Sequence, residues 1–169
     1  KQAQKNKSIV ESILKNVQKN GDSAVKKYEK KFTGASISTL RVSVTEIKNA
    51  YSKVSKNEIT ALRIAKTRVE KTEFTVKTIF KDKKINHDGV QILKKFIPIP
   101  SIGCYIPGGL AKYPSSVIMS VIPAKVAGVK RIVVVSPPNS NGKIDPLTIV
   151  AADICGATEI YKTGGVQAI

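Results

Sequence analysis

The stretch that decides the fold is GCYIPGGLAKYPSS at residues 103–116. Residues 102–106 are a short apolar run that predicts the end of a strand. The Pro-Gly-Gly at 107–109 predicts a tight turn, because proline fixes one φ angle and glycine tolerates positive φ. The Pro-Ser-Ser at 114–116 predicts the start of a helix with a serine as its N-cap. Ligands of open α/β sheets bind at such turns, so this stretch also predicts a site.

Strands and helices continue to alternate after this stretch. Pro123 is expected to kink the first helix or split it in two, because proline lacks an N–H and clashes with the preceding turn. The β-branched run at 132–135 is typical of a buried parallel strand. The predicted elements are a helix from Ser115 to Gly128, a strand at 132–135, a helix from the N-cap Asp145 to Gly156, a strand at 159–162, and a glycine turn at 164–165 leading into a helix. The alternation predicts a parallel sheet with right-handed crossovers.

The first 100 residues have a different pattern, in which apolar residues recur mostly at helical spacing. The Ile-Pro-Ile-Pro-Ser at 97–101 cannot be a central strand, because its two prolines remove ladder donors. We therefore place a domain boundary there, between residues 1–100 and residues 101–169. The predicted elements before it are helices over about 3–20, from Asp22 to Phe32, from Thr45 to Val54 and from Ile59 to Val76, a short strand near Leu40 and Val42, loops or turns at 81–84 and 87–89, and a strand at 90–96.

Composition narrows the class of protein. The chain has 169 residues, of which 41% are hydrophobic, enough for one domain or parts of two. It contains no apolar run long enough for a membrane span and no signal peptide. Because the chain starts at Lys1 rather than methionine and stops at Ile169, where a helix is expected to begin, we expect a fragment cut at both ends. Cys104 and Cys155 have no CxxC spacing, which argues against a disulfide framework and a structural zinc site, and favours a reducing compartment.

Positive charge is concentrated in the first part of the chain. Residues 1–95 carry 23 Lys and Arg against 9 Asp and Glu, whereas residues 96–169 carry 6 against 3. A basic half is compatible with nucleic-acid binding. The lysines fall on the polar sides of amphipathic patterns, however, and no nucleic-acid motif accompanies them. We favour solvated helix faces.

The candidate ligand site consists of the two glycine turns. Their backbone N–H groups and the following helix starts suit a phosphate or another anion. Tyr105 is expected at the mouth of the first turn and Gln167 at the mouth of the second, where it offers a donor and an acceptor. Neither a G-x-G-x-x-G fingerprint nor a P-loop is present. On pattern alone, a ligand site and purely structural tight turns are equally supported.

Candidates for catalysis are few. His87 is the only histidine and lies in a polar loop, so we interpret it as a solvated surface residue. Cys104 lacks an adjacent base and is better interpreted as a buried structural thiol. With no histidine to activate them, Ser115 and Ser116 are interpreted as capping residues. Asp145 is interpreted as a helix cap, and Asp153 as a surface residue.

Five blocks of the sequence follow one another over about 65 residues. They are GCYIPGG at 103–109, YPSSVIM at 113–119, IPAKVAGV at 122–129, SPP at 136–138 and GGVQAI at 164–169. In this order the five blocks resemble those of histidinol dehydrogenases. The first half of the chain is similar more loosely, through GDSA at 21–24 with Tyr28, Lys31 and Phe32.

This resemblance implies an NAD-dependent, zinc-containing enzyme of histidine biosynthesis. It would oxidise L-histidinol through L-histidinaldehyde to L-histidine with two NAD molecules in turn, as a cytoplasmic homodimer. The implied fold is an incomplete Rossmann-like parallel sheet of three αβα layers at 101–169, preceded by a mostly helical segment of a second domain at 1–100. Tyr105 and Gln167 match family positions that contact NAD. The family's zinc ligands and catalytic Glu-His pair match positions beyond Ile169, so we expect neither here.

Two other classes of function remain open on the sequence. One is a noncatalytic α/β binding or assembly domain that keeps the glycine turns. The other is a basic nucleic-acid-binding module that uses residues 1–95. A membrane partner is not expected.

Overall fold

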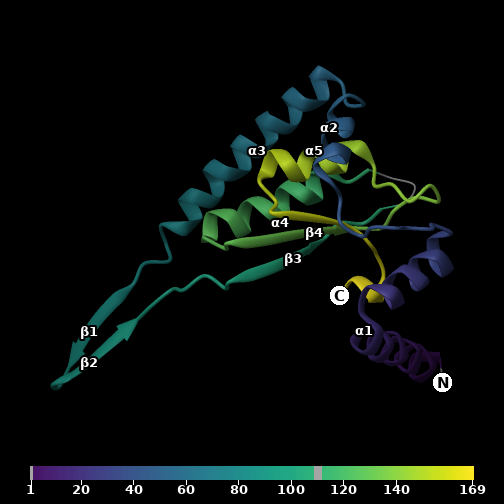
Figure 1. Ribbon diagram of the computed structural model, residues 1–169. Helices are drawn as coiled ribbons and strands as arrows, with labels where there is room; N and C mark the ends of the chain where they lie inside the picture. Colours follow the sequence, from purple (N-terminus) through teal and green to yellow (C-terminus); the bar gives the residue numbers. More distant parts are fainter. Residues whose placement is uncertain (1, 109–111) are drawn as a thin grey trace.

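A three-stranded parallel sheet is the centre of the computed structural model, which describes residues 2–108 and 112–169 (Figure 1). Its strands lie in the order β3-β4-β5. The connections that join them are helices, as expected for parallel strands. The elements are β3 (Ser101–Tyr105), α4 (Pro114–Ala127), β4 (Arg131–Ser136), α5 (Pro146–Cys155) and β5 (Glu159–Lys162). The parallel α/β fold predicted for residues 101–169 is therefore confirmed.

Helices cover one face of this sheet (Figure 1). Alternate strand residues such as Cys104, Val134 and Ile160 are buried in one core with α4 and α5. The intervening residues lie on the opposite face, where Tyr105 and Val133 line an open hollow. The described residues thus supply two of the three expected layers.

The start of α4 differs from the sequence prediction. Pro114 takes the first helical position, where its missing N–H is not needed, and this makes Tyr113 the N-cap. Among the described residues no side chain caps this helix, so the prediction of a serine cap was wrong. The helix also continues through Pro123 as one element to Ala127. Most of its residues are buried, and we infer that packing outweighs the hydrogen bond that Pro123 cannot make.

The predicted cap of α5 is confirmed. Asp145 Oδ1 accepts a hydrogen bond of 2.9 Å from the backbone N–H of Leu147. Pro146 follows at the first helical position, and the helix ends before Gly156. Caps of this kind satisfy N–H groups that have no partner within the helix.

The N-terminal half is helical, as predicted. α1 (Gln2–Thr33) is broken at Gly21, whose φ of 54° and ψ of −138° are not helical, so it consists of the two predicted halves. α2 (Val44–Tyr51) and α3 (Lys56–Lys77) each begin with a capping box, formed by Ser43 with Glu46 and by Ser55 with Glu58. α2 and α3 share the core of the sheet through Ala50 and Leu62, and Val42, which precedes α2, belongs to the same core. The domain boundary at residue 100 stays a prediction.

The segment around Leu40 and Val42 joins the edge of the sheet. Arg41 forms an isolated antiparallel bridge with Tyr161 of β5. Val42 N–H donates to Ile160 O at 2.8 Å, and Lys162 N–H donates to Leu40 O at 2.7 Å. The predicted short strand is thus reduced to a single bridge.

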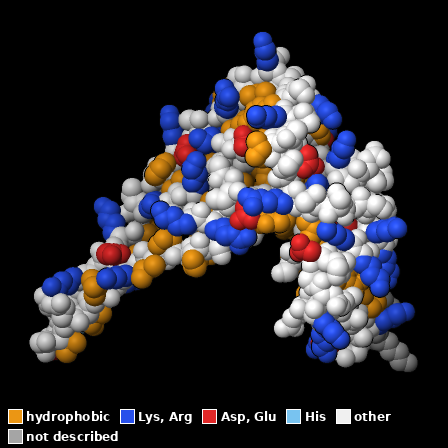
Figure 2. Space-filling view, viewed as in Figure 1, with side chains coloured by type: hydrophobic (Ala, Val, Ile, Leu, Met, Phe, Trp, Pro, Cys, Tyr) orange, Lys and Arg blue, Asp and Glu red, His pale blue; other side chains and the backbone are white. Residues whose placement is uncertain are grey.

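A two-stranded hairpin projects from the body of the molecule (Figures 1 and 2). It is made of β1 (Lys83–His87) and β2 (Val90–Lys94), joined by the turn Asp88–Gly89 with φ angles of 47° and 80°. The predicted strand at 90–96 is present but ends at Lys94. The loops predicted at 81–84 and 87–89 are wrong in part, because Lys83, Lys84 and His87 belong to β1. All ten strand residues are exposed, so no buried face marked β1 in the sequence. Within the described residues, no helix combines the length and the apolar character needed to cross a membrane.

Candidate functional site

The ends of all three parallel strands meet at the carboxyl edge of the sheet. Ile106, Pro107 and Gly108 follow β3, Pro137 follows β4, and Thr163 to Gln167 follow β5. This is the edge at which open α/β sheets bind ligands. Gly109 of the first predicted turn lies outside the described residues.

Pro137 lies between the two glycine turns and contacts both. A Cβ atom at Gly164 would lie 2.5 Å from Pro137 Cβ, and one at Gly108 would lie 2.7 Å from Pro137 Cγ. Both distances are too short for a side chain, so close packing requires glycine at both positions. Packing against Pro137 thus accounts for glycine at Gly108 and Gly164, and it does not decide whether the turns also bind a ligand.

Tyr105 connects the first turn to the second. It is the last residue of β3, its side chain lies on the open face of the sheet, and it is 40% exposed. Its hydroxyl oxygen accepts a hydrogen bond of 3.2 Å from the backbone N–H of Gly165. The ring thus offers an accessible surface at the turn while its hydroxyl helps to hold Gly165.

Gln167 lies on the same turn, in a short 3₁₀ helix, η1 (Val166–Ala168), rather than in the α-helix start that was predicted. Its side chain points inward and is only 6% exposed. Gln167 Nε2 donates to Glu29 Oε1 at 2.8 Å. The structure therefore brings Tyr105 and Gln167 to one turn, but Gln167 is buried rather than open at its mouth. Their contact with NAD stays a prediction.

Glu29 of α1 is the residue that sequence reasoning missed. It is 0% exposed, and its Oε1 also accepts hydrogen bonds of 2.8 Å from Thr163 Oγ1 and from the N–H of Gly164. One signal was present: Glu29 follows the buried Val25 by four residues, which places a carboxyl group on the apolar side of the helix. Buried carboxyl groups on apolar faces need hydrogen-bond partners.

The amides of the second turn are already engaged within the protein. Gly164 N–H is bonded to Glu29 and Gly165 N–H to Tyr105. The expectation that these N–H groups would face an anion is therefore not met in this structure. Among the described residues of the two turns, Tyr105 is 40% exposed, and Pro107, Gly108 and Gly165 are exposed as well.

The other sequence candidates do not join this site. Burial raises the pKa of the Cys104 thiol, and burial raises that of Cys155 to about 11, so neither is poised as a thiolate nucleophile. His87 is exposed on the hairpin, 3.6 Å from the Asp88 carboxyl. Asp153 accepts a hydrogen bond of 2.7 Å from Tyr51. Among the described residues, no group of three or more His, Cys, Asp and Glu side chains is placed to hold a metal ion.

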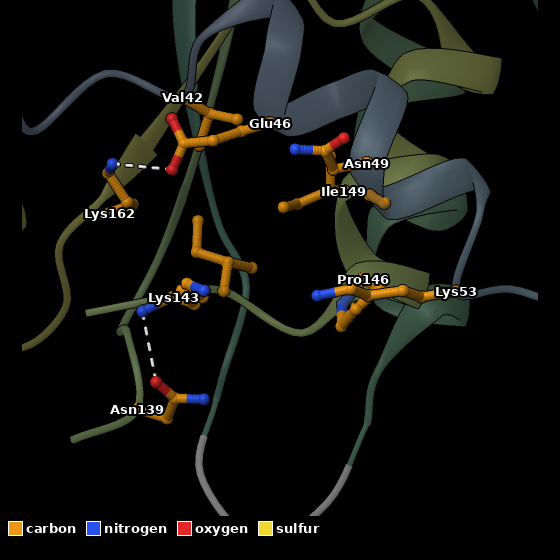
Figure 3. A pocket seen from close by; sticks show the side chains of 11 residues that line it. Val42, Glu46, Asn49, Lys53, Asn139, Lys143, Pro146, Ile149 and Lys162 are labelled. Carbon is orange, nitrogen blue, oxygen red and sulfur yellow. Dashed lines mark hydrogen bonds and ion pairs between the residues drawn. The ribbon is translucent and has the colours of Figure 1, made fainter. Parts of the chain in front are cut away.

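A separate cavity of about 260 Å³ lies between α2 and the loop before α5 (Figure 3). Lys162 is buried beside it and donates to Glu46 Oε1 at 2.9 Å. Burial of Glu46 opposes ionisation, but hydrogen bonds from Ser43 and Lys162 outweigh it, and the net effect lowers the pKa of Glu46. Lys162 and Glu46 thus tie α2 to the end of β5, next to Thr163.

The parallel sheet and the glycine turns at its strand ends define an α/β protein, and ligands of open α/β sheets bind at this carboxyl edge. The model of one protein family, histidinol dehydrogenase, matches residues 1–169. The chain belongs to the histidinol dehydrogenase family.

Individual relatives agree with this assignment. The histidinol dehydrogenase of Methanococcus maripaludis is 46% identical over 161 residues, which are 95% of this chain and 38% of the relative. That of Bacillus licheniformis is 43% identical over 167 residues, 96% of this chain and 38% of the relative. The crystal structure of histidinol dehydrogenase from Elizabethkingia anophelis superposes with a TM-score of 0.90 at 37% identity, covering 96% of this chain and 37% of that one. The chain thus spans a little over a third of the length of these proteins.

The described residues offer a surface suited to NAD but no set of ligands for zinc. For NAD, the exposed ring of Tyr105 at the strand-end turn provides a surface on which a planar group can stack. For zinc, the donor set is missing from the described residues, since these place no cluster of ligating side chains together. We therefore assign no zinc ligand to this chain.

Proposed function

We propose that the complete protein is an L-histidinol dehydrogenase that oxidises L-histidinol through L-histidinaldehyde to L-histidine with two NAD molecules. The observation that carries this proposal is the family match over residues 1–169. The structural match with a TM-score of 0.90, which covers 96% of this chain, supports it.

Within this proposal, the chain contributes part of the NAD site. NAD supplies the chemistry of hydride acceptance. Tyr105 provides a ring surface for a planar part of the dinucleotide and holds Gly165 through its hydroxyl. Pro137 fixes the spacing of the two turns through its contacts with Gly108 and Gly164. We place the zinc ligands and the catalytic Glu-His pair outside residues 1–169.

The test is histidinol-dependent reduction of NAD by the purified complete protein. We expect two NADH per L-histidine formed, because the alcohol is oxidised twice. A folded protein that binds NAD but forms no NADH from histidinol would contradict the enzyme and favour a noncatalytic α/β binding domain. Steeply salt-dependent binding of short duplexes would instead favour a nucleic-acid-binding module.

We further propose that the complete protein works as a cytoplasmic homodimer. The family resemblance supports both statements. Sedimentation of the complete protein tests the homodimer. We expect the mass of a dimer, and a monomer across the accessible concentration range would contradict this proposal.

A further inference from the structure

Glu29 is unusual for a glutamate because it is buried and hydrogen-bonded entirely within the protein. Its side chain is completely buried, and one oxygen, Oε1, accepts three hydrogen bonds of 2.8 Å. Carboxyl groups are rarely buried without such partners, because the loss of hydration must be offset by hydrogen bonds. Three donors on a single atom therefore indicate a fixed position rather than a solvated surface residue.

All three donors belong to the turn after β5. They are the hydroxyl of Thr163, the backbone N–H of Gly164 and the amide Nε2 of Gln167, which lie 134 to 138 positions from Glu29 in the chain. The second half of α1 thus fixes this turn from within the protein. Tyr105 holds the same turn from the open side of the sheet, through Gly165.

The contact also determines how the Gln167 amide is turned. Since Nε2 is bound to Glu29, the other amide atom, Oε1, is left as an acceptor with no hydrogen-bond partner among the described residues. An amide that lacked Glu29 could rotate, because its two ends are nearly the same size. Glu29 is therefore the residue that sets the orientation of Gln167.

We propose that Glu29 is a positioning residue for the NAD site, acting through Gln167 and the Gly164–Gly165 turn. The proposal rests on the proposed function, because it assumes that this turn receives NAD. It does not make Glu29 a catalytic residue, since the side chain is completely buried and its Oε1 is bound by three donors of the protein itself. Misplacement of binding groups by a fraction of an ångström is enough to weaken binding.

The test compares two substitutions at this position in the complete protein. Glu29→Leu keeps the approximate size but removes the acceptor, so all three donors lose their partner. Glu29→Gln keeps one oxygen as an acceptor. We expect the NAD dissociation constant to rise about tenfold or more in Glu29→Leu and to stay within about threefold of wild type in Glu29→Gln. Glu11→Leu is the matched control, because Glu11 is an exposed glutamate on the same helix, and it should bind NAD like wild type.

Binding of NAD is measured by calorimetry, with KM for NAD, KM for histidinol and the melting temperature alongside. A folded Glu29→Leu variant with wild-type NAD affinity would overturn the proposal. The proposal would also be overturned if both KM values rose and kcat fell by similar factors while the melting temperature decreased. These changes together would indicate a structural role alone. If Glu29→Leu does not fold, Thr163→Val removes one donor only; it should raise the dissociation constant about two- to fivefold, and no change would overturn the proposal. A wild-type protein that binds NAD but does not oxidise histidinol would refute the proposed function and leave the comparison at Glu29 valid.

Discussion

Pro137 makes two glycines obligatory, one on either side of it. Gly164→Ala places a Cβ atom 2.5 Å from Pro137 Cβ, so the turn or the proline must move. We expect a loss of about 1–3 kcal/mol in the free energy of unfolding, the usual cost of overpacking. Gly103→Ala is the matched control, because no described atom beyond its two chain neighbours lies within 4 Å of the added Cβ, and it should change stability by less than about 0.5 kcal/mol. Denaturant unfolding measures both, and equal effects would contradict this account of the turn.

The lowered pKa of Glu159 makes the stability of the fold depend on pH in the acid range. Hydrogen bonds from Arg131 and Tyr161 lower its pKa from 4.5 to about 2, against the opposing effect of burial. Because the folded pKa is depressed, this contribution to stability is present above the unfolded value and is lost as the pH falls toward 2. In Glu159→Gln we expect the free energy of unfolding to decrease less steeply than in wild type as the pH falls from about 5 to 2.

Arg131→Met tests the cause of this shift. It removes the partner that binds Glu159 Oε1 at 2.6 Å and should flatten the same part of the profile partially, because Tyr161 still donates to Oε2 at 2.7 Å. If the free energy of unfolding fell with pH as in wild type in both variants, groups other than Glu159 would control the acid dependence of stability.

At the scale of elements, capping boxes determine where α2 and α3 begin. Ser55 accepts from Glu58 N–H while Glu58 accepts from Ser55 N–H. We expect Ser55→Ala to cost about 1 kcal/mol, because it leaves an N–H at the helix start without a partner. Thr60→Ala on the same helix is the control: its hydroxyl bonds only Lys56 O, and alanine is the better helix former, so stability should hold or rise. Urea unfolding distinguishes the two, and a neutral Ser55→Ala would contradict the role of the cap.

The elements differ in how well the sequence predicts them. α5 is marked by Asp145, Pro146 and Gly156, and β4 by four consecutive β-branched residues, so local signals suffice. β1 carries no apolar alternation and exists because β2 pairs with it across a two-residue turn. The serine cap predicted for α4 failed because Pro114 competes for the first helical position.

The candidate site was predictable only in its local parts. Tyr105 and the glycine turns follow from strand ends and turn residues, both of which are short-range patterns. Glu29 joins the turn across more than 130 positions, and no local pattern specifies which residue of a helix meets which turn. The inward orientation of Gln167 depends on that contact, so it could not be predicted either.

At the scale of the whole molecule, one side of the sheet carries the helices and the other carries Tyr105. Exposed apolar residues lie on the open side and along the hairpin, as Figure 2 shows for the hairpin. Soluble proteins seldom expose such surfaces without a partner. The chain spans 38% of its Methanococcus maripaludis relative. We therefore expect poor solubility or association when residues 1–169 are prepared alone.

The most direct test of the account is the NAD affinity of the Tyr105→Ala variant of the complete protein, with its zinc content measured on the same sample. Tyr105 is an exposed aromatic side chain of the candidate site, and no zinc ligand is assigned near it. We predict an NAD dissociation constant raised about tenfold, with zinc content unchanged. An unchanged NAD affinity in a folded, zinc-loaded variant would contradict the claim that this turn forms part of the NAD site.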